Sequence, residues 1–373
     1  MAKIILHVVE AAGGVERYLI SLLTKLQGYA EYKHVLACST TYDVKKYNGL
    51  VSAIEIIPSM HNVISLTDDV TAIREVRHVI KKYKPDIVYC HSSKAGAIGR
   101  IADLGVSNKL LYNAHGWSFN IKDASQKRLM AYELIERFLA PFADKIICIS
   151  EYEKQSALAH RIAKEEKLIV IDNGIDFEVF TDISPKNRRE LRIPEQAFVV
   201  GTIGRLAPQK APDVFIEMAS QIKKHIPNAF FLMVGDDIGD GKMRSEVESK
   251  IKSSGLQESF CITGWVDNPL DYLGLFDVAT LLSRWEGFGL VLPEYMYMGK
   301  PIVATKADAI PYVVSDAGLL VNIDDYKAAA ESVIKLYEDQ ELRNRLIEIG
   351  KERVKLFNVQ RTADEHKRVF DML

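Results

Sequence analysis

Short runs of apolar, often β-branched residues alternate in the first half of the chain with longer stretches in which apolar residues recur every three or four positions. The stretch 66–83 is the clearest helix, because Val70, Ile73 and Val76 fall on one face and Pro85 follows its end. Such alternation predicts a parallel sheet covered by helices on both faces. We expect strands at 3–9, 34–38, 86–91, 109–114, 145–149 and 168–171, and helices at 15–27, 66–83, 95–104 and 126–139.

The same pattern begins again near residue 198. Residues 181–196 contain many charged residues and two prolines with little periodicity, which is typical of a linker or a surface excursion. The second half therefore predicts another α/β domain of similar build. We expect its strands at 198–203, 229–234, 260–263, 278–282, 302–305 and 319–321, and its helices at 212–224, 243–253, 290–298 and within a helical tail from 325 to 373.

Composition and charge exclude several classes of protein. The chain has 373 residues, of which 48% are hydrophobic and 26% charged, which is ordinary for a folded protein. A formal net charge of -2 argues against nucleic acid as a partner. The first apolar run is too short for a signal peptide, and no run is long enough to span a membrane, so we expect a cytoplasmic protein.

The cysteines do not form a metal-binding pattern. They lie far apart, with no CxxC pair or histidine cluster near them. We therefore interpret them as buried, reduced thiols, and we expect neither a bound metal nor a cofactor. The four positions are Cys38, Cys90, Cys148 and Cys261.

Ligands of open parallel sheets bind beyond the carboxyl ends of the strands, so the polar residues that follow each strand are the candidates for chemistry. Gly13 and Gly14 join a strand to a helix, where backbone amides can receive a phosphate, although a plain tight turn would also require glycine. Arg205 and Lys210 lie in one loop after a strand. An arginine fork and a compact lysine charge suit a diphosphate, and the alternative is that both are solvated surface residues.

The segment 286–294 carries the strongest signal. Pro293 marks the first turn of a helix, so Gly289 and Leu290 lie at its N-terminus, where amides can bind a phosphate. Glu286 precedes the helix and Glu294 lies inside it, and carboxylates accept hydrogen bonds from the paired hydroxyls of a sugar or a ribose. Glu294 alone would also be explained as a partner of the helix dipole, and Glu286 as an ordinary loop carboxylate.

Several motifs together resemble the retaining glycosyltransferases of family 4. They are GRLAPQK at 204–210, GDD at 235–237, GWV at 264–266, SRWEGFGLVLPE at 283–294 and NGID at 173–176, with weaker matches in GGVER at 13–17 and AHGWSF at 114–119. The resemblance covers nearly the whole chain and implies the GT-B architecture, in which two Rossmann-like domains with doubly wound parallel sheets face each other across a cleft. It implies an acceptor domain at 1–173, completed by a crossover helix at 358–373, and a nucleotide-sugar domain at 174–357.

The resemblance also implies roles for particular residues. In the second domain these are Arg205 and Lys210 for the donor diphosphate, Glu294 for the ribose, Glu286 with the backbone of Phe288 and Gly289 for the transferred sugar, the amides of Leu290 and Val291 for phosphate, and the backbone near Val266 for the base. In the first domain, His115 would meet the sugar near its 6-position and Gly13–Gly14 would close over the diphosphate. A histidine after a strand is otherwise more often structural. The implied catalytic residues are His115, Arg205, Lys210 and Glu286.

One loop departs from the family pattern. Family members often carry Gly-Gly-x-Pro-Glu after the strand that here ends at Thr305, whereas this chain has Ala307–Tyr312 without the glycine pair and with tyrosine in place of glutamate. This loop lies near the donor in the family, so the identity of the donor sugar and the packing around Lys210 are the properties that the departure affects. No Asp-x-Asp pair follows a strand, so we expect a metal-free reaction in which cations and the helix end stabilise the departing diphosphate.

The expected function is transfer of a hexose-type sugar, with retention, from a nucleotide-diphosphate sugar such as a UDP-sugar to a saccharide or lipid-linked acceptor. Polysaccharide or glycoconjugate biosynthesis is the expected process. A noncatalytic GT-B partner subunit, a sugar-nucleotide epimerase and a phosphorylase are the alternatives. The segment 128–142 combines large apolar residues with cations. It predicts a helix packed in the core or, alternatively, a peripheral contact with the inner face of a membrane.

Overall fold

A computed structural model describes residues 2–10, 13–61, 63–237 and 239–373. The chain divides into two compact units. Unit 1 comprises Met1–Asp176 and Phe357–Leu373, and unit 2 comprises Phe177–Leu356. Among the described residues, no helix is long and apolar enough to cross a membrane.

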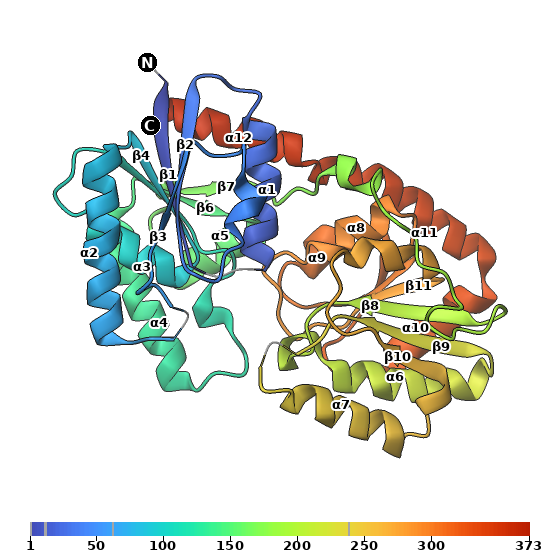
Figure 1. The fold of residues 1–373 in the computed structure, drawn as a ribbon. Coiled ribbons are helices and arrows are strands. Elements are labelled where there is room, and N and C mark those ends of the chain that lie inside the picture. Colours follow the sequence, from blue (N-terminus) through green and yellow to red (C-terminus); the bar gives the residue numbers. More distant parts are fainter. Residues whose placement is uncertain (1, 11–12, 62, 238) are drawn as a thin grey trace. The chain divides into compact units, whose positions relative to one another are not determined.

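Unit 1 is built on a parallel sheet, seven-stranded within the described residues, in the order β3-β2-β1-β4-β5-β6-β7 (Figure 1). The order reverses between β1 and β4, which makes this position the switch point of the sheet. The strands are β1 (Lys3–Val9), β2 (Tyr32–Cys38), β3 (Ala53–Ile56), β4 (Ile87–His91), β5 (Lys109–Asn113), β6 (Lys145–Cys148) and β7 (Leu168–Val170), and the helices are α1 (Gly14–Leu26), α2 (Leu66–Tyr83), α3 (Ser93–Ala102), α4 (Gln126–Leu139), α5 (Glu151–Ala159) and α12 (Val359–Met372).

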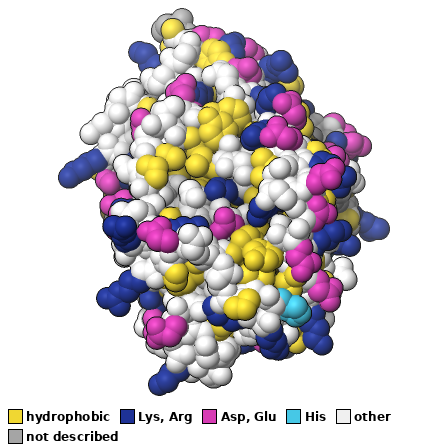
Figure 2. Space-filling view, turned by 90° about the vertical axis from the view of Figure 1, so that its right-hand side faces the viewer, with side chains coloured by type: hydrophobic (Ala, Val, Ile, Leu, Met, Phe, Trp, Pro, Cys, Tyr) yellow, Lys and Arg dark blue, Asp and Glu magenta, His cyan; other side chains and the backbone are white. Residues whose placement is uncertain are grey.

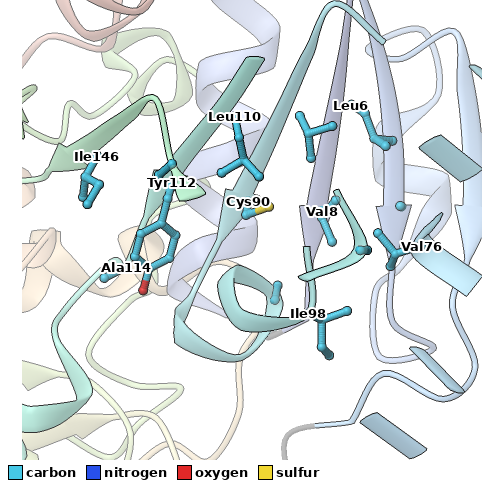
Figure 3. Packing of buried hydrophobic residues seen from close by; sticks show 14 of the residues in the cluster. Leu6, Val8, Val76, Cys90, Ile98, Leu110, Tyr112, Ala114 and Ile146 are labelled. Atoms are coloured by element: carbon cyan, nitrogen blue, oxygen red, sulfur yellow. The ribbon is translucent and has the colours of Figure 1, made fainter. Parts of the chain in front are cut away.

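The two faces of this sheet are covered by different helices. On one face, strand residues such as Val8 and Tyr112 pack with Val76 of α2 and Ile98 of α3 (Figure 3). On the other face, Ile5 and neighbouring strand residues pack with α1 and α12, which lie side by side (Figure 1). The last helix of the chain therefore belongs to the core of unit 1.

Helix α2 shows how local sequence sets an element's limits. The Ser65 side chain accepts a hydrogen bond from the amide of Asp68 at the N-terminus, and Asp68 and Asp69 occupy the favourable first turn. Lys84 adopts a left-handed conformation at the C-terminus, directly before Pro85. The observed bounds are those that the apolar spacing predicts.

Unit 2 repeats the design with a second parallel sheet, six-stranded within the described residues, in the order β10-β9-β8-β11-β12-β13. Its switch point lies between β8 and β11. The strands are β8 (Phe198–Ile203), β9 (Ala229–Val234), β10 (Phe260–Ile262), β11 (Val278–Leu281), β12 (Ile302–Thr305) and β13 (Gly318–Val321), and the helices are α6 (Pro212–His225), α7 (Lys242–Ser253), α8 (Val291–Tyr297), α9 (Ile310–Val314), α10 (Tyr326–Glu338) and α11 (Gln340–Arg353).

Several expectations need correction. Strand β3 and helices α5 and α9 were not predicted, because they are short and their apolar residues show no clear period. The expected helical tail is divided into α10, α11 and α12. Cys261 is only half-buried, whereas the other three thiols are buried as expected.

The interpretation of α4 as a core-packed helix is wrong. Only Glu136 and Leu139 of this helix are buried. Four of its large apolar side chains face solvent instead, and they are Met130, Leu134, Ile135 and Phe138.

Charged side chains of both signs are interspersed over the face drawn in Figure 2, with small groups of hydrophobic side chains between them. This view shows no broad field of one sign, in keeping with the net charge of -2.

Candidate functional site

Two loops of unit 2 begin where the order of its sheet reverses. Strand β8 ends at Ile203 and leads into Arg205 and Lys210, and β11 ends at Leu281 and leads into Glu286. Because β8 and β11 are adjacent parallel strands, their carboxyl ends meet at one edge of the sheet. Arg205 and Lys210 line a small pocket there, together with Leu282 from the second loop.

Lys210 and Glu286 form an ion pair at this edge. Nζ of Lys210 lies 2.6 Å from Oε2 of Glu286, and the hydroxyl of Ser283 donates to the same oxygen at 3.1 Å. The side chains are 19% and 12% exposed, so the pair is shielded but reachable. The structure thus brings together two of the predicted residues that are 76 positions apart in the chain.

Arg205 is exposed, and it makes no ion pair within the described part of the chain. Its guanidinium donates to Oε1 of Gln209 at 3.3 Å. Gln209 in turn donates to the carbonyl of Trp285 at 3.0 Å, and the amide of Arg284 donates to the carbonyl of Gln209 at 2.8 Å. Gln209 therefore ties the loop after β8 to the loop after β11.

The loop that departs from the family pattern contacts Glu286 directly. A carboxylate oxygen of Asp308 accepts a hydrogen bond from the backbone amide of Glu286 at 2.9 Å. The backbone carbonyl of Glu286 accepts a second one from the amide of Ala309 at 3.3 Å. Asp308 itself has a φ of 46°, in the left-handed region that aspartate adopts more readily than most other residues. The backbone of Glu286 is therefore hydrogen-bonded on both its amide and its carbonyl to the segment in which this chain departs from the family that it resembles.

The remaining donor-side candidates surround the start of α8. Gly289 has a φ of 81°, and a Cβ there would come within 3.2 Å of Cγ of Glu286. Phe288 and Glu294 are buried, and Leu290 is the N-cap. The helix begins at Val291, one residue later than expected, and has seven residues. Its first amides lack intrahelical acceptors, as at any helix start.

Val266 lies farther along the same sheet edge. It is half-buried in the loop after β10, which is separated from β8 by β9. The neighbouring Trp265 is 59% exposed, and its indole N–H donates to the carbonyl of Asp237 at 3.2 Å, which links the loops after β9 and β10. Asp237 caps the start of α7 by accepting from the amide of Met243 at 3.1 Å.

The candidates of unit 1 lie at the carboxyl edge of its own sheet. Gly13 precedes α1 with a φ of 95°, and Gly14 is the first residue of that helix. His115 follows β5 with a φ of 52°, and its amide donates to Oδ1 of the buried Asn113 at 2.9 Å. Burial lowers the pKa of His115 to about 3, so the imidazole is neutral near pH 7.

Sequence reasoning missed the residues that position Lys210 and Glu286. Ser283 and Asp308 contact Glu286, and Gln209 joins the two loops. Arg284 was also missed; it donates to Asp213 and Asp324, both at 2.7 Å, and to the carbonyl of Pro208 at 2.9 Å. Their position directly after predicted strands was the available signal.

The sequence matches two family descriptions, one in each half. Residues 12–179 match Glycosyltransferase Family 4, and residues 183–353 match Glycosyl transferases group 1. The UDP-Gal:alpha-D-GlcNAc-diphosphoundecaprenol alpha-1,3-galactosyltransferase of Escherichia coli is 27% identical over 84% of this chain and 82% of its own. The capsular polysaccharide biosynthesis glycosyltransferase CapM of Staphylococcus aureus is also 27% identical, with the same coverage.

Solved structures share the whole architecture. HepE of Anabaena, crystallised with UDP and glucose, superposes with a TM-score of 0.84 at 20% identity, and the match covers 100% of both chains. This likeness establishes the fold. With one family description on each half and two parallel α/β units of the expected order, the chain belongs to the GT-B glycosyltransferases of the family 4 type.

Proposed function

We propose that this glycosyltransferase moves a hexose-type sugar from a UDP-sugar to a hydroxyl of a saccharide or lipid-linked glycan, with retention of configuration and without a metal ion. The observation that supports it best is the Lys210–Glu286 pair at 2.6 Å, with the exposed Arg205 on the same pocket. Two cations at a strand edge suit a diphosphate, and a neighbouring carboxylate suits sugar hydroxyls.

In this proposal, binding of the nucleotide-sugar donor replaces the ion pair between Lys210 and Glu286. A diphosphate beside Lys210 offers a stronger anionic partner than a single carboxylate, and Arg205 has the exposure to reach it. Glu286, held by Ser283 and by the backbone contact to Asp308, then accepts hydrogen bonds from the sugar. The positive charge stabilises the diphosphate as the bond to the sugar breaks.

The other donor contacts follow the family resemblance. Glu294 binds the ribose, the amides of Leu290 and Val291 bind phosphate, and the backbone near Val266 meets the base. From unit 1, His115 meets the sugar and Gly13–Gly14 meets the diphosphate. The leaving phosphate oxygen takes the proton of the acceptor hydroxyl on the same face of the sugar, so the new bond keeps the configuration of the old one.

The names of the relatives support the proposed substrates. One uses UDP-galactose with a diphosphoundecaprenol-linked acceptor, one acts in capsular polysaccharide biosynthesis, and a protein of the same fold was crystallised with UDP. By analogy with these relatives, we propose that this chain uses a UDP-sugar donor and a lipid-linked or saccharide acceptor. The process would be polysaccharide or glycoconjugate biosynthesis.

Product analysis tests this proposal. Purified protein is incubated with UDP-hexoses and acceptor candidates, and the anomeric configuration of the product is read by NMR. Retention, with UDP released only when an acceptor is present, supports it. An inverted product would reject the retaining mechanism, and acceptor-independent release or epimerisation of the donor would favour the phosphorylase or epimerase alternatives. Activity abolished by EDTA and restored by a divalent ion would reject metal independence.

The exposed face of α4 extends the proposal to a membrane surface. Met130, Leu134 and Phe138 recur every four residues and are 61–72% exposed, and Phe142 continues the row with its ring against that of Phe138. We call these four residues the apolar stripe. Exposed cations flank it, namely Lys127, Arg128 and Arg137. An apolar row bordered by cations suits an anionic bilayer, where a lipid-linked acceptor would be found.

Vesicle flotation tests this contact. Wild-type protein should float with vesicles containing anionic phosphatidylglycerol, and the double variant Leu134→Glu/Phe138→Glu should not. Both side chains are more than 60% exposed, so the variant should remain folded. Leu66→Glu/Val63→Glu, at exposed apolar positions outside α4, is the matched control and should float like the wild type. Equal flotation of all three proteins would remove α4 from the proposal.

A further inference from the structure

Four buried or half-buried histidines form a continuous hydrogen-bonded row across the sheet of unit 1. Nδ1 of His34 lies 3.0 Å from Nε2 of His7, whose Nδ1 lies 3.1 Å from Nε2 of His91. Nδ1 of His91 lies 3.0 Å from Nε2 of His115. We call these four residues the histidine row. It begins in the interior on β2 and ends at the candidate site after β5.

The strand register explains why the row exists. His34 is aligned with Ile5 on β1, two residues before His7, and His7 is aligned with Tyr89 on β4, two residues before His91. His91 is aligned with Asn113 on β5, two residues before His115. Because side chains two residues apart in a strand lie on one face, His34, His7 and His91 share a face, and each lies two residues nearer the carboxyl edge than the one before. His115 continues this progression just beyond the end of β5.

The row has a fixed number of protons. Each neutral imidazole carries one N–H, so four rings supply four protons, and the three internal hydrogen bonds use three of them. The fourth proton must lie at one end of the row, on Nε2 of His34 or on Nδ1 of His115. The protonated nitrogen of every ring is therefore set by the choice between these two ends.

The buried end is the unfavourable place for that proton. His34 is 3% exposed, and its Nε2 has no hydrogen-bond partner among the described residues. A buried N–H without an acceptor is rarer and more costly than an acceptor atom without a donor. His115 is half-buried at the end of the row, and its Nε2 is the ring nitrogen that bonds His91; no hydrogen bond to its Nδ1 is present in the part of the chain that the structure describes. An N–H at that end can meet solvent or a ligand.

The rings are neutral as this count requires. Burial lowers the pKa of His34 to about 4, and burial together with neighbouring histidines lowers the pKa of His7 and His91 well below the usual value. The titratable groups packed against the row from α1, β4 and α12 are Tyr18, Tyr89 and His366. The hydroxyls of Tyr18 and Tyr89 both lie 3.0 Å from Nε2 of His366, so these two side chains contact the row through their rings and place their hydroxyls on a histidine outside it.

We propose that the histidine row fixes His115 as the tautomer protonated on Nδ1, so that it meets a ligand oxygen as a hydrogen-bond donor, and that His34 is the positioning residue that selects this tautomer. The ligand in question rests on the proposed function, in which His115 meets the transferred sugar. The tautomer itself does not depend on that function. The His115 ring is held by its hydrogen bond to His91 and by ring contacts with His91 and Tyr18, whose ring centres lie 5.3 Å and 4.6 Å away.

The wild-type protein provides the first test. Long-range ¹H–¹⁵N correlation spectra of protein labelled with ¹⁵N-histidine distinguish the protonated from the unprotonated ring nitrogen, and single His→Gln variants assign the nine histidines. We expect His34, His7, His91 and His115 all to be protonated on Nδ1 at pH 7. A His115 protonated on Nε2, or a row with charged rings, would overturn the proposal whatever the activity of the enzyme.

An isosteric pair of variants provides the second test. His34→Asn keeps an N–H donor toward His7, so the direction of the row and the His115 tautomer should be unchanged. His34→Asp as a carboxylate only accepts, which should reverse the row, move the His115 proton to Nε2 and lower kcat/KM by about tenfold or more relative to His34→Asn. Unchanged tautomers in a folded His34→Asp protein would refute the role of His34. Absence of any sugar transfer by wild type would refute the proposed function and leave the tautomer assignment standing.

Discussion

The buried pair of Arg100 and Glu136 offers the sharpest test of how α4 is attached. Nη2 of Arg100 lies 2.8 Å from Oε2 of Glu136, and the side chains are 0% and 3% exposed. The hydroxyl of Tyr112 donates to the other carboxylate oxygen at 2.7 Å, and the guanidinium lies 4.0 Å from the centre of that tyrosine ring. Helix α4 is thus joined to α3 and β5 by one charged cluster.

Removing one partner should be far worse than removing both. Glu136→Leu leaves a buried guanidinium without its counter-charge, and Arg100→Met leaves a buried carboxylate, so each should lower the free energy of unfolding by about 3–5 kcal/mol. The double variant Arg100→Met/Glu136→Leu retains only the unmet hydroxyl of Tyr112, which costs about 1–3 kcal/mol. It should therefore be more stable than either single variant.

Urea unfolding followed by tryptophan fluorescence measures these free energies. Trp117 is 2% exposed and lies edge-on to Tyr112, so it reports unit 1, and replacing Trp265 and Trp285 by Phe removes the signal of unit 2. A double variant whose loss equals the sum of the single losses would show that the two charges are not coupled and would refute this reasoning.

Three further outcomes are expected. Burial raises the pKa of Glu153 to about 8, above its ordinary 4.5, so the ionisation of Glu153 costs stability between about pH 5 and pH 8. In urea titrations, the free energy of unfolding of wild type relative to Glu153→Gln should therefore fall over this range, by at most about 1.4 kcal/mol per pH unit, because the buried histidines contribute equally to both proteins. Gly235→Ala places a Cβ 2.1 Å from the carbonyl of Gly204 at a φ of 135°, which should lower the melting temperature measured by calorimetry and raise KM for the donor. Lys210→Met should lower kcat/KM by about a hundredfold in a UDP-release assay, whereas Lys224→Met, at an exposed lysine of α6, should not change it.

Much of the fold could be predicted from local sequence. Helix α2 has strong apolar spacing, an N-cap serine and a following proline, and its bounds agree with the prediction. Strands β8, β9 and β12 also agree, because their runs of four to six residues are short for a helix and rich in β-branched or aromatic residues. Strand β3 has half-buried and exposed residues at the sheet edge, and such a pattern carries little signal.

The residues of the candidate site could be selected from the sequence, but the contacts between them could not be predicted. Placement after a strand was enough to select Lys210 and Glu286, but their contact depends on β8 and β11 being neighbours, which is a property of the whole sheet. The same holds for the histidine row, whose members come from four different strands or strand ends. The core-packed alternative for α4 was wrong because periodicity cannot say whether an apolar face is covered by another element.

The polypeptide enters and leaves unit 2 at one joint. Ile175 and Asn358 pair with each other, with the amide of Ile175 donating to the carbonyl of Phe357 at 2.8 Å and the amide of Val359 donating to the carbonyl of Ile175 at 3.0 Å. Residues 177–356 are therefore an insertion into an otherwise continuous unit 1. A short linker across this joint would allow unit 1 to be expressed as one continuous chain without residues 177–356, and the corresponding unit of a related protein could be inserted at the same place.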